Sequence, residues 1–97
     1  MNNPAAPELT RRRPREFREW QKLRTWGKLP DREAVVPGYL LRSAREAAGL
    51  TQAQLAGRLC ITQQAVARAE RWPSNPTIDL VKRWAAACDR RLEIRLI

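Results

Sequence analysis

The stretch from Thr51 to Glu70 constrains the fold of this chain most, because it predicts two short helices joined by a tight turn. Thr51 and Thr62 each stand where a helix would begin, and a threonine hydroxyl at that position accepts a hydrogen bond from the opening turn. Gln54 follows Thr51 at capping-box spacing. Apolar residues recur at helical spacing in both helices, so each helix has one face to bury. They are Leu55 and Leu59 in the first helix and Ala65, Val66 and Ala69 in the second.

The opposite face of the second helix carries three polar side chains, Gln63, Gln64 and Arg68. An amide offers a donor and an acceptor that match the edge of adenine in the major groove of DNA, and a guanidinium can fork onto guanine. A solvated helix face without a ligand is the simpler alternative. We interpret residues 51–70 as a helix-turn-helix and these three side chains as its base-reading surface.

Residues 40–88 resemble the Xre or phage-repressor type of helix-turn-helix. The pattern of that family is Thr-Gln-x-x-Leu-Ala, a turn, and then Ser/Thr-Gln-x-x-Val/Ile-x-x-x-Glu. It is matched here by Thr51-Gln52, Leu55-Ala56, Thr62-Gln63, Val66 and Glu70. The resemblance implies an all-α, lambda-repressor-like domain of about four core helices that binds double-stranded DNA.

By position, the resemblance assigns roles in DNA binding to individual side chains. Gln52 would contact a phosphate and brace the recognition helix. Gln63 and Gln64 would read bases, and Arg68 would read a base or grip the backbone. Further expected contacts to the DNA backbone are Thr51, Thr62 and Arg71.

Two residues depart from the family pattern. Cys60 stands in the turn where glycine is usual, and a residue with a side chain that is forced to positive φ costs about 1–2 kcal/mol. Trp72 replaces a common glycine after Glu70, so the resemblance does not fix the course of the following loop.

Helices are expected on both sides of this motif. The first spans Tyr39 to Ala48 and stops at Gly49, after which Leu50 packs back on the helix end. The last begins after Thr77, which caps it, and Asp79 lies favourably near its positive end. Its expected buried side consists of Ile78, Val81, Trp84, Ala85 and Cys88, with Trp84 in the core rather than stacked on a ligand.

The final seven residues, 91–97, alternate between apolar and charged side chains, which is typical of a strand. Leu92, Ile94 and Leu96 would share one face and form the dimerisation surface. Because no second strand is evident, we expect an antiparallel ribbon with the same segment of another copy. Such a tail resembles certain Xre-type antitoxins; a frayed end, or a strand added to another protein, is the alternative.

The first 36 residues form a basic N-terminal arm, followed by the DNA-binding domain over 37–89 and the dimerisation strand over 90–97. Residues 1–10 are expected to be disordered. An amphipathic helix is expected over 15–26, with Phe17, Trp20, Leu23 and Trp26 along one side, and then a linker up to Pro37. This helix would pack on the domain or its dimer mate, dock on a partner protein, or contact DNA or lipid. The residues expected to contact DNA or a partner are Arg11, Arg12, Arg13, Arg15, Phe17 and Trp20.

The composition favours a small binding module. A chain of 97 residues has room for one core, and a net charge of +9 favours a polyanionic partner. The absence of histidine leaves no usual zinc site, and neither a catalytic triad nor an acid–base pair is evident, so we expect no metal, no cofactor and no enzymatic activity. Cys60 and Cys88 are expected to be small buried side chains, with a disulfide or redox sensing as the alternative.

These features together predict a sequence-specific transcriptional repressor that binds a pseudo-palindromic operator as a homodimer. Neither a signal-peptide pattern nor an apolar run of membrane-spanning length is evident, so the expected location is the cytoplasm, on the bacterial nucleoid. The more specific hypothesis is the antitoxin and autoregulator of a toxin–antitoxin operon, which would also bind its cognate toxin. The alternative is a stand-alone Xre-type regulator whose only partner is DNA.

Overall fold

The structure is a computed structural model that describes residues 15–97. Two compact units meet at the peptide bond between Ala34 and Val35. Every regular element among the described residues is helical, so the prediction of an all-α fold is confirmed for this part of the chain. The stretch that we expect to be disordered and the arginines at positions 11–13 lie outside the described residues.

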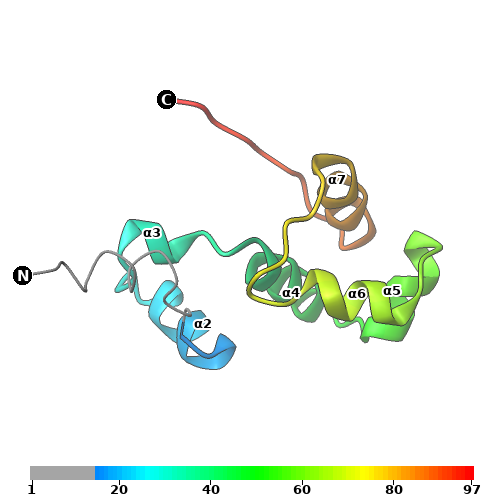
Figure 1. The fold of residues 1–97 in the computed structure, drawn as a ribbon, viewed down its shortest axis with the longest axis horizontal. Helices are drawn as coiled ribbons and strands as arrows, with labels where there is room; N and C mark the ends of the chain where they lie inside the picture. Colours follow the sequence, from blue (N-terminus) through cyan, green and yellow to red (C-terminus); the bar gives the residue numbers. More distant parts are fainter. Residues whose placement is uncertain (1–14) are drawn as a thin grey trace, which may run out of the picture. The chain divides into compact units, whose positions relative to one another are not determined.

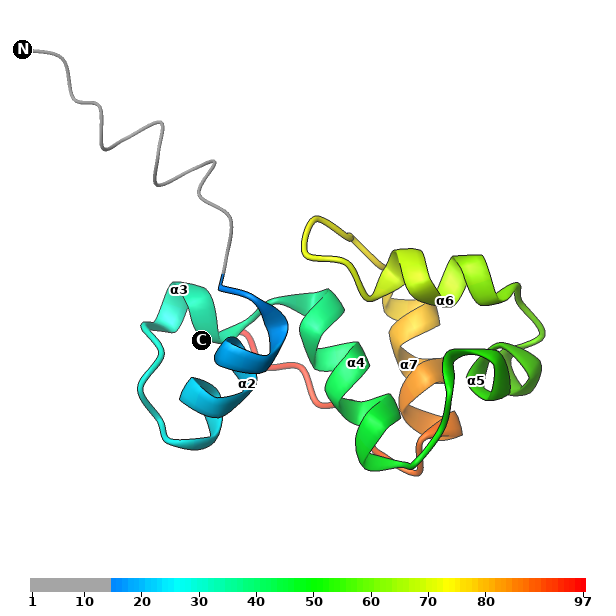
Figure 2. The same cartoon turned by 90° about the horizontal axis from the view of Figure 1, so that it is seen from below.

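The larger unit is built from four helices (Figure 1). They are α4 (Pro37–Ala47), α5 (Gln52–Leu59), α6 (Gln63–Ala69) and α7 (Ile78–Ala87). The helix α5 packs against both α6 and α7, and α4 packs against α7, as Figure 2 shows from the second direction. The helix α4 begins two residues earlier than predicted because Pro37 suits the first helical position, where its missing N–H has no partner to lose.

Trp84 lies at the centre of the core and is fully buried. Its indole Nε1 donates a hydrogen bond to the carbonyl oxygen of Leu41 over 3.0 Å, so the polar end of the ring is satisfied and α7 is fixed to α4. The core position predicted for Trp84 is therefore confirmed. Ile78 was predicted on the same buried side but is exposed, whereas Leu80 packs against the core. The buried core residues are Leu41, Leu55, Ala56, Leu59, Val66, Ala69, Trp84 and Cys88.

Three threonine caps set the starts of α5, α6 and α7. Thr51 forms the predicted capping box with Gln54, and the hydroxyls of Thr62 and Thr77 accept from backbone N–H groups three residues on. The helix starts were therefore predictable from sequence alone.

The helix ends are made by residues in the left-handed conformation. Gly49 has a φ of 74°, and the N–H of Leu50 returns to the carbonyl of Arg45, which closes α4 as predicted. Cys60 closes α5 in the same way at a φ of 57°, so the expected strain is present in the turn.

The two cysteines are both free, and they differ in environment. The side chain of Cys60 is exposed, which corrects the expectation that it is buried, because the left-handed turn directs it away from the core. Cys88 is buried as expected, and its burial raises the pKa of its thiol. This thiol therefore stays protonated near neutral pH.

The smaller unit contains α2 (Phe17–Thr25) and α3 (Asp31–Ala34). Phe17 and Trp20 of α2 are buried, and the indole of Trp20 donates to the carbonyl oxygen of Glu33 over 2.7 Å. Trp26 lies beyond the end of α2 and is exposed, so it does not extend the apolar side as predicted. The stretch predicted as a linker contains α3, which the indole of Trp20 stabilises by that long-range contact.

Residues 91–97 follow α7 without regular secondary structure, so the predicted C-terminal strand is not found in the single described chain (Figure 1). A strand needs a hydrogen-bonding mate, and no second strand is available among the described residues. Pairing across a dimer stays a prediction.

The strain at Cys60 predicts that Cys60→Gly stabilises the protein. Removing Cβ relieves the left-handed conformation, and part of this gain is offset by the greater freedom of glycine in the unfolded chain. We expect a net gain of about 1 kcal/mol, or roughly 4–8 °C in Tm by thermal unfolding. Cys60→Ser is the matched control, because it removes the sulfur and keeps Cβ. Equal stability of the two variants would contradict the assignment of strain to this turn.

Candidate DNA interface

The exposed face of α6 carries the three side chains that were predicted to read bases. Gln63, Gln64 and Arg68 are all exposed, while Val66 and Ala69 on the opposite face are buried against α5 and α7. The guanidinium of Arg68 makes no hydrogen bond or ion pair within residues 15–97. The helix therefore presents two amides and one available cation to an external ligand.

A buried ion pair fixes the end of α6 to α4. The guanidinium of Arg45 donates to both carboxylate oxygens of Glu70, from Nε over 2.5 Å and from Nη2 over 3.0 Å. Arg45 is 8% exposed and Glu70 is 6% exposed. The third donor of Arg45 reaches the carbonyl oxygen of Leu50 over 2.8 Å, beyond the end of α4. The hydrogen bonds to Glu70 raise the pKa of Arg45, so its guanidinium stays charged.

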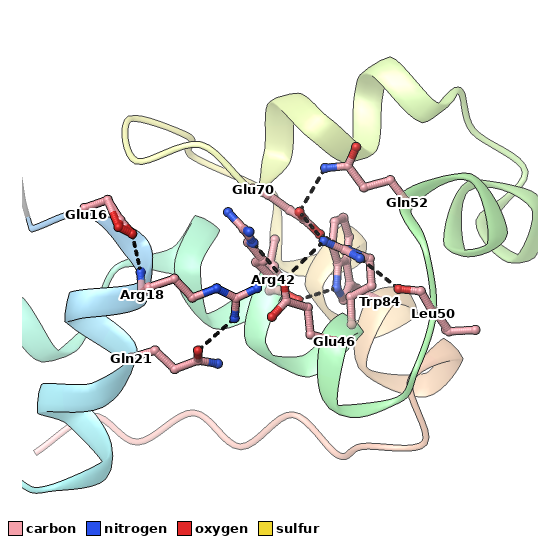
Figure 3. Close-up of polar contacts among 11 residues, drawn as sticks. Glu16, Arg18, Gln21, Arg42, Glu46, Leu50, Gln52, Glu70 and Trp84 are labelled. Carbon is pink, nitrogen blue, oxygen red and sulfur yellow. Dashed lines mark hydrogen bonds and ion pairs between the residues drawn. The ribbon is translucent and has the colours of Figure 1, made fainter.

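Gln52 connects this ion pair to α5. Its Nε2 donates to Oε1 of Glu70 over 3.1 Å, and Figure 3 shows the amide directed from α5 toward Glu70. The predicted brace between the first residue of α5 and the recognition helix is therefore present. We define the Glu70 brace as Arg45, Gln52 and Glu70, which join α4, α5 and α6.

Gly38 lets the start of α4 approach the end of α6. A Cβ placed on Gly38 would lie 2.2 Å from the carbonyl oxygen of Arg71, a distance that backbone atoms cannot accommodate without moving. This contact and the Glu70 brace fix α6 from two points along α4. The orientation of the exposed face of α6 is therefore set by the rest of the domain.

Two arginines join the carboxyl ends of α5 and α7. Arg58 of α5 donates to the carbonyl oxygen of Ala87 over 2.9 Å, and Arg83 of α7 donates to that of Leu59 over 2.5 Å. Each cation thus caps the carboxyl end of the other helix, where the helix dipole favours positive charge. The guanidinium groups of these two arginines are thus engaged inside the domain.

A hollow of about 350 Å³ lies beside the carboxyl end of α6. Arg71 lines it, and its guanidinium has no partner within the described residues. The hydroxyl oxygen of Ser74 is also buried there without a hydrogen-bond partner in the same part of the chain. The remaining lining residues are Arg68, Ala69, Pro73, Asn75 and Pro76. Two cations and an unsatisfied hydroxyl are thus gathered next to the exposed face of α6.

The backbone-contact candidates lie at the starts of α5 and α6 and just after the end of α6. The side chains of Thr51 and Thr62 are exposed, but both oxygens accept from the backbone as helix caps. Gln52 is half-buried and donates to Glu70, and Arg71 is exposed.

In the smaller unit, Arg15 pairs with Glu33 at 3.3 Å, and the rings of Phe17 and Trp20 are packed away from solvent.

Three residues of the candidate site were not predicted from the sequence. Arg45 occupies a helical position among apolar neighbours, and this charge on an apolar face was the available signal for a buried pair. Gly38 gave no local signal, because its contact is with the backbone of Arg71, more than 30 residues away. Ser74 gave none, because the burial of its hydroxyl depends on the path of the loop.

The comparison with known families agrees with this geometry. The sequence model of the helix-turn-helix family HTH_3 matches residues 41–94, more than half of the chain. The chain belongs to this family, and its domain is that of a DNA-binding transcriptional regulator. No curated protein matches the chain. Among the described residues, no cluster of acidic or cysteine side chains is arranged to hold a metal, and no helix is long and apolar enough to cross a membrane.

The Glu70 brace predicts that Arg45→Ala is strongly destabilising. The variant leaves the buried carboxylate of Glu70 without its cation, which costs about 3–5 kcal/mol in the free energy of unfolding. Chemical denaturation measures this loss. Replacing both partners, in Arg45→Met with Glu70→Leu, should recover much of it, because no buried charge remains.

Arg68→Ala is the matched control for this experiment. Its side chain is exposed and unpaired within residues 15–97, so its loss should change stability by less than about 0.5 kcal/mol. An Arg45→Ala variant as stable as Arg68→Ala would show that the ion pair does not hold α6.

Proposed function

We propose that the protein is a sequence-specific transcriptional repressor whose helix α6 enters the major groove of DNA. The observation that carries this proposal is the exposed Gln63, Gln64 and Arg68 on a helix that the Glu70 brace holds in one orientation. Direct readout needs a helix whose orientation is fixed before binding, because ordering the helix on binding would otherwise cost affinity.

The backbone contacts follow from the same surface. Arg71 and the hydroxyl of Ser74 lie in the hollow beside α6, and both can donate to a phosphate oxygen. The caps Thr51 and Thr62 use their oxygens to accept from the protein, which leaves their hydroxyl hydrogens available for phosphate. Gln52 retains its amide oxygen for other contacts, but its main role is to hold Glu70. These contacts position α6, and α6 supplies the specificity.

Repression would follow from dimerisation. Two copies joined through residues 91–97, with Leu92, Ile94 and Leu96 at the contact, place two α6 helices in successive major grooves about 34 Å apart. A dimer of this kind covers a pseudo-palindromic operator and excludes polymerase from the promoter. The proposed setting is the bacterial cytoplasm, with the protein on the nucleoid.

The more specific proposal is an antitoxin that regulates its own operon. It is supported by the compact α2–α3 unit, which lies outside the helix-turn-helix in the sequence and could bind a protein partner such as a toxin, and by the tail after α7. The alternative is a stand-alone regulator with DNA as its only partner. Co-purification from the native host distinguishes the two, since a stoichiometric second protein is expected only of the antitoxin.

Changing Gln63, Gln64 and Arg68 together to Ala should remove sequence selectivity and leave the fold intact. Each good base contact contributes about 1–3 kcal/mol of discrimination. Loss of all three should therefore lower the ratio of the affinity for the specific duplex to that for a scrambled duplex by more than about a hundredfold. Titration of both duplexes, with the specific one selected by the unmodified protein from random sequence, measures this ratio.

Arg71→Ala is the matched control. The loss of one phosphate contact should weaken binding to both duplexes alike and lower the slope of log affinity against log salt by about 0.9. A triple variant with an unchanged specificity ratio would show that these side chains of α6 do not read the bases.

A further inference from the structure

The tail after α7 borders a hollow that the domain itself leaves unfilled. Asp89 reverses the chain at a φ of 58°, and the N–H of Arg90 returns to the carbonyl of Ala85. The tail then lies beside α7, so that Leu92 and Ile94 line a hollow of about 410 Å³ with Ile78 from the first turn of that helix. Lys82, Arg90 and Arg91 complete its lining. Figure 1 shows the backbone of the tail running from α7 to the C-terminus.

The tail exposes more apolar surface than a solvated end requires. Ile94 is 56% exposed and Leu96 is 95% exposed. Glu93 and Arg95 lie on the other face of the alternating segment, with Nε of Arg95 at 3.4 Å from Oε1 of Glu93. The segment therefore separates an apolar face from a face that carries Arg91, Glu93 and Arg95, with Ile97 at its end.

The order of these residues is self-complementary when two copies run antiparallel. With the two-fold axis at Ile94, Leu92 of one copy lies opposite Leu96 of the other, and Glu93 lies opposite Arg95. Both apolar pairs and both charge pairs are then favourable, since opposite charges and apolar side chains across an antiparallel pair are stabilising. All seven residues from 91 to 97 have a partner in this register.

Neighbouring registers are unfavourable. An axis at Glu93 places Glu93 opposite itself and Arg91 opposite Arg95, and an axis at Arg95 places two arginines together. An axis at Leu92 would need Asp89 and Arg90 in the ribbon, but both residues are held in the turn that ends α7. The charge pattern and the turn thus select the axis at Ile94.

We propose that residues 91–97 pair with a second copy about a two-fold axis at Ile94, and that Leu96 of each copy fills the hollow of the other. Residues directly opposite in an antiparallel pair direct their side chains to the same face. Leu96 of the second copy therefore falls beside Leu92, which lines the hollow together with Ile78. A two-stranded ribbon alone is marginal in water, and the cover that Ile78 provides makes this one stable.

This inference rests on the proposed dimeric repressor and fixes the register of its interface. It predicts which engineered cysteines form disulfides between two chains. The experiment uses the full chain with Cys60→Ser, because Cys60 is exposed and would react, whereas Cys88 is buried and can stay. Ile94→Cys should cross-link to itself under mild oxidation. Leu96→Cys alone should not, because its two copies lie about 14 Å apart along the ribbon. A mixture of Leu92→Cys and Leu96→Cys chains should form the mixed disulfide.

Charge reversal tests the same register without cysteines. Either Glu93→Arg or Arg95→Glu places like charges opposite each other twice, and should weaken the dimer about tenfold in sedimentation. The double variant restores both pairs and should return the dissociation constant to within about twofold. Self-cross-linking of Leu96→Cys that is faster than that of Ile94→Cys, or a double variant as weak as the single ones, would overturn the proposal.

Binding to DNA separates this inference from the proposed function. A chain that binds the selected half-site but stays monomeric at all concentrations, or whose tail binds an acidic protein in place of a second copy, overturns the interface alone. Cross-links in the expected register without selective DNA binding would support the interface and overturn the proposed repressor function.

Discussion

The buried ion pair between Arg45 and Glu70 is the interaction on which the DNA-binding surface depends. It joins α4 to the end of α6, and Gln52 adds α5 to the same carboxylate. A buried pair of this kind contributes little net stability compared with apolar residues of the same size, because both ions lose their hydration. Its effect is on geometry. Glu70 is satisfied only when three helices meet at one point, so any arrangement that rotates α6 leaves a buried charge without a partner. The face that carries Gln63, Gln64 and Arg68 is presented in one orientation for this reason.

The arginines of the domain fall into two groups, those paired inside the protein and those that residues 15–97 leave unpaired on its surface. Arg45, Arg58 and Arg83 are tied to carboxylate or carbonyl oxygens inside the domain. Arg68 and Arg71 have no such acceptor within residues 15–97 and lie on one surface beside α6. A net charge of +9 predicts an anionic partner but does not say which arginines meet it. The hydrogen bonds make that distinction, and they leave the unpaired cations next to the polar face of the recognition helix.

Features with a local cause were predictable from the sequence. The capping threonines, the left-handed Cys60 and the core position of Trp84 each follow from a few neighbouring residues. The misses have tertiary causes. Ile78 fits the apolar period of α7, but the packed core of the domain does not extend to the first turn of that helix. Its side chain therefore lines a hollow. The burial of Arg45 depends on a carboxylate 25 residues away. The short helix α3 was taken for a linker because a four-residue helix has almost no periodicity, and a strand whose mate is another molecule cannot form in one chain.

The central claim is that the braced α6 reads DNA in the major groove, and methylation interference tests it most directly. Dimethyl sulfate modifies guanine at N7, in the major groove, and adenine at N3, in the minor groove. On a duplex selected by the unmodified protein, the account predicts interference at guanine N7 in two half-sites about one helical turn apart, and little interference at adenine N3 within them. Interference confined to adenine N3, or spread evenly along the duplex, would contradict it.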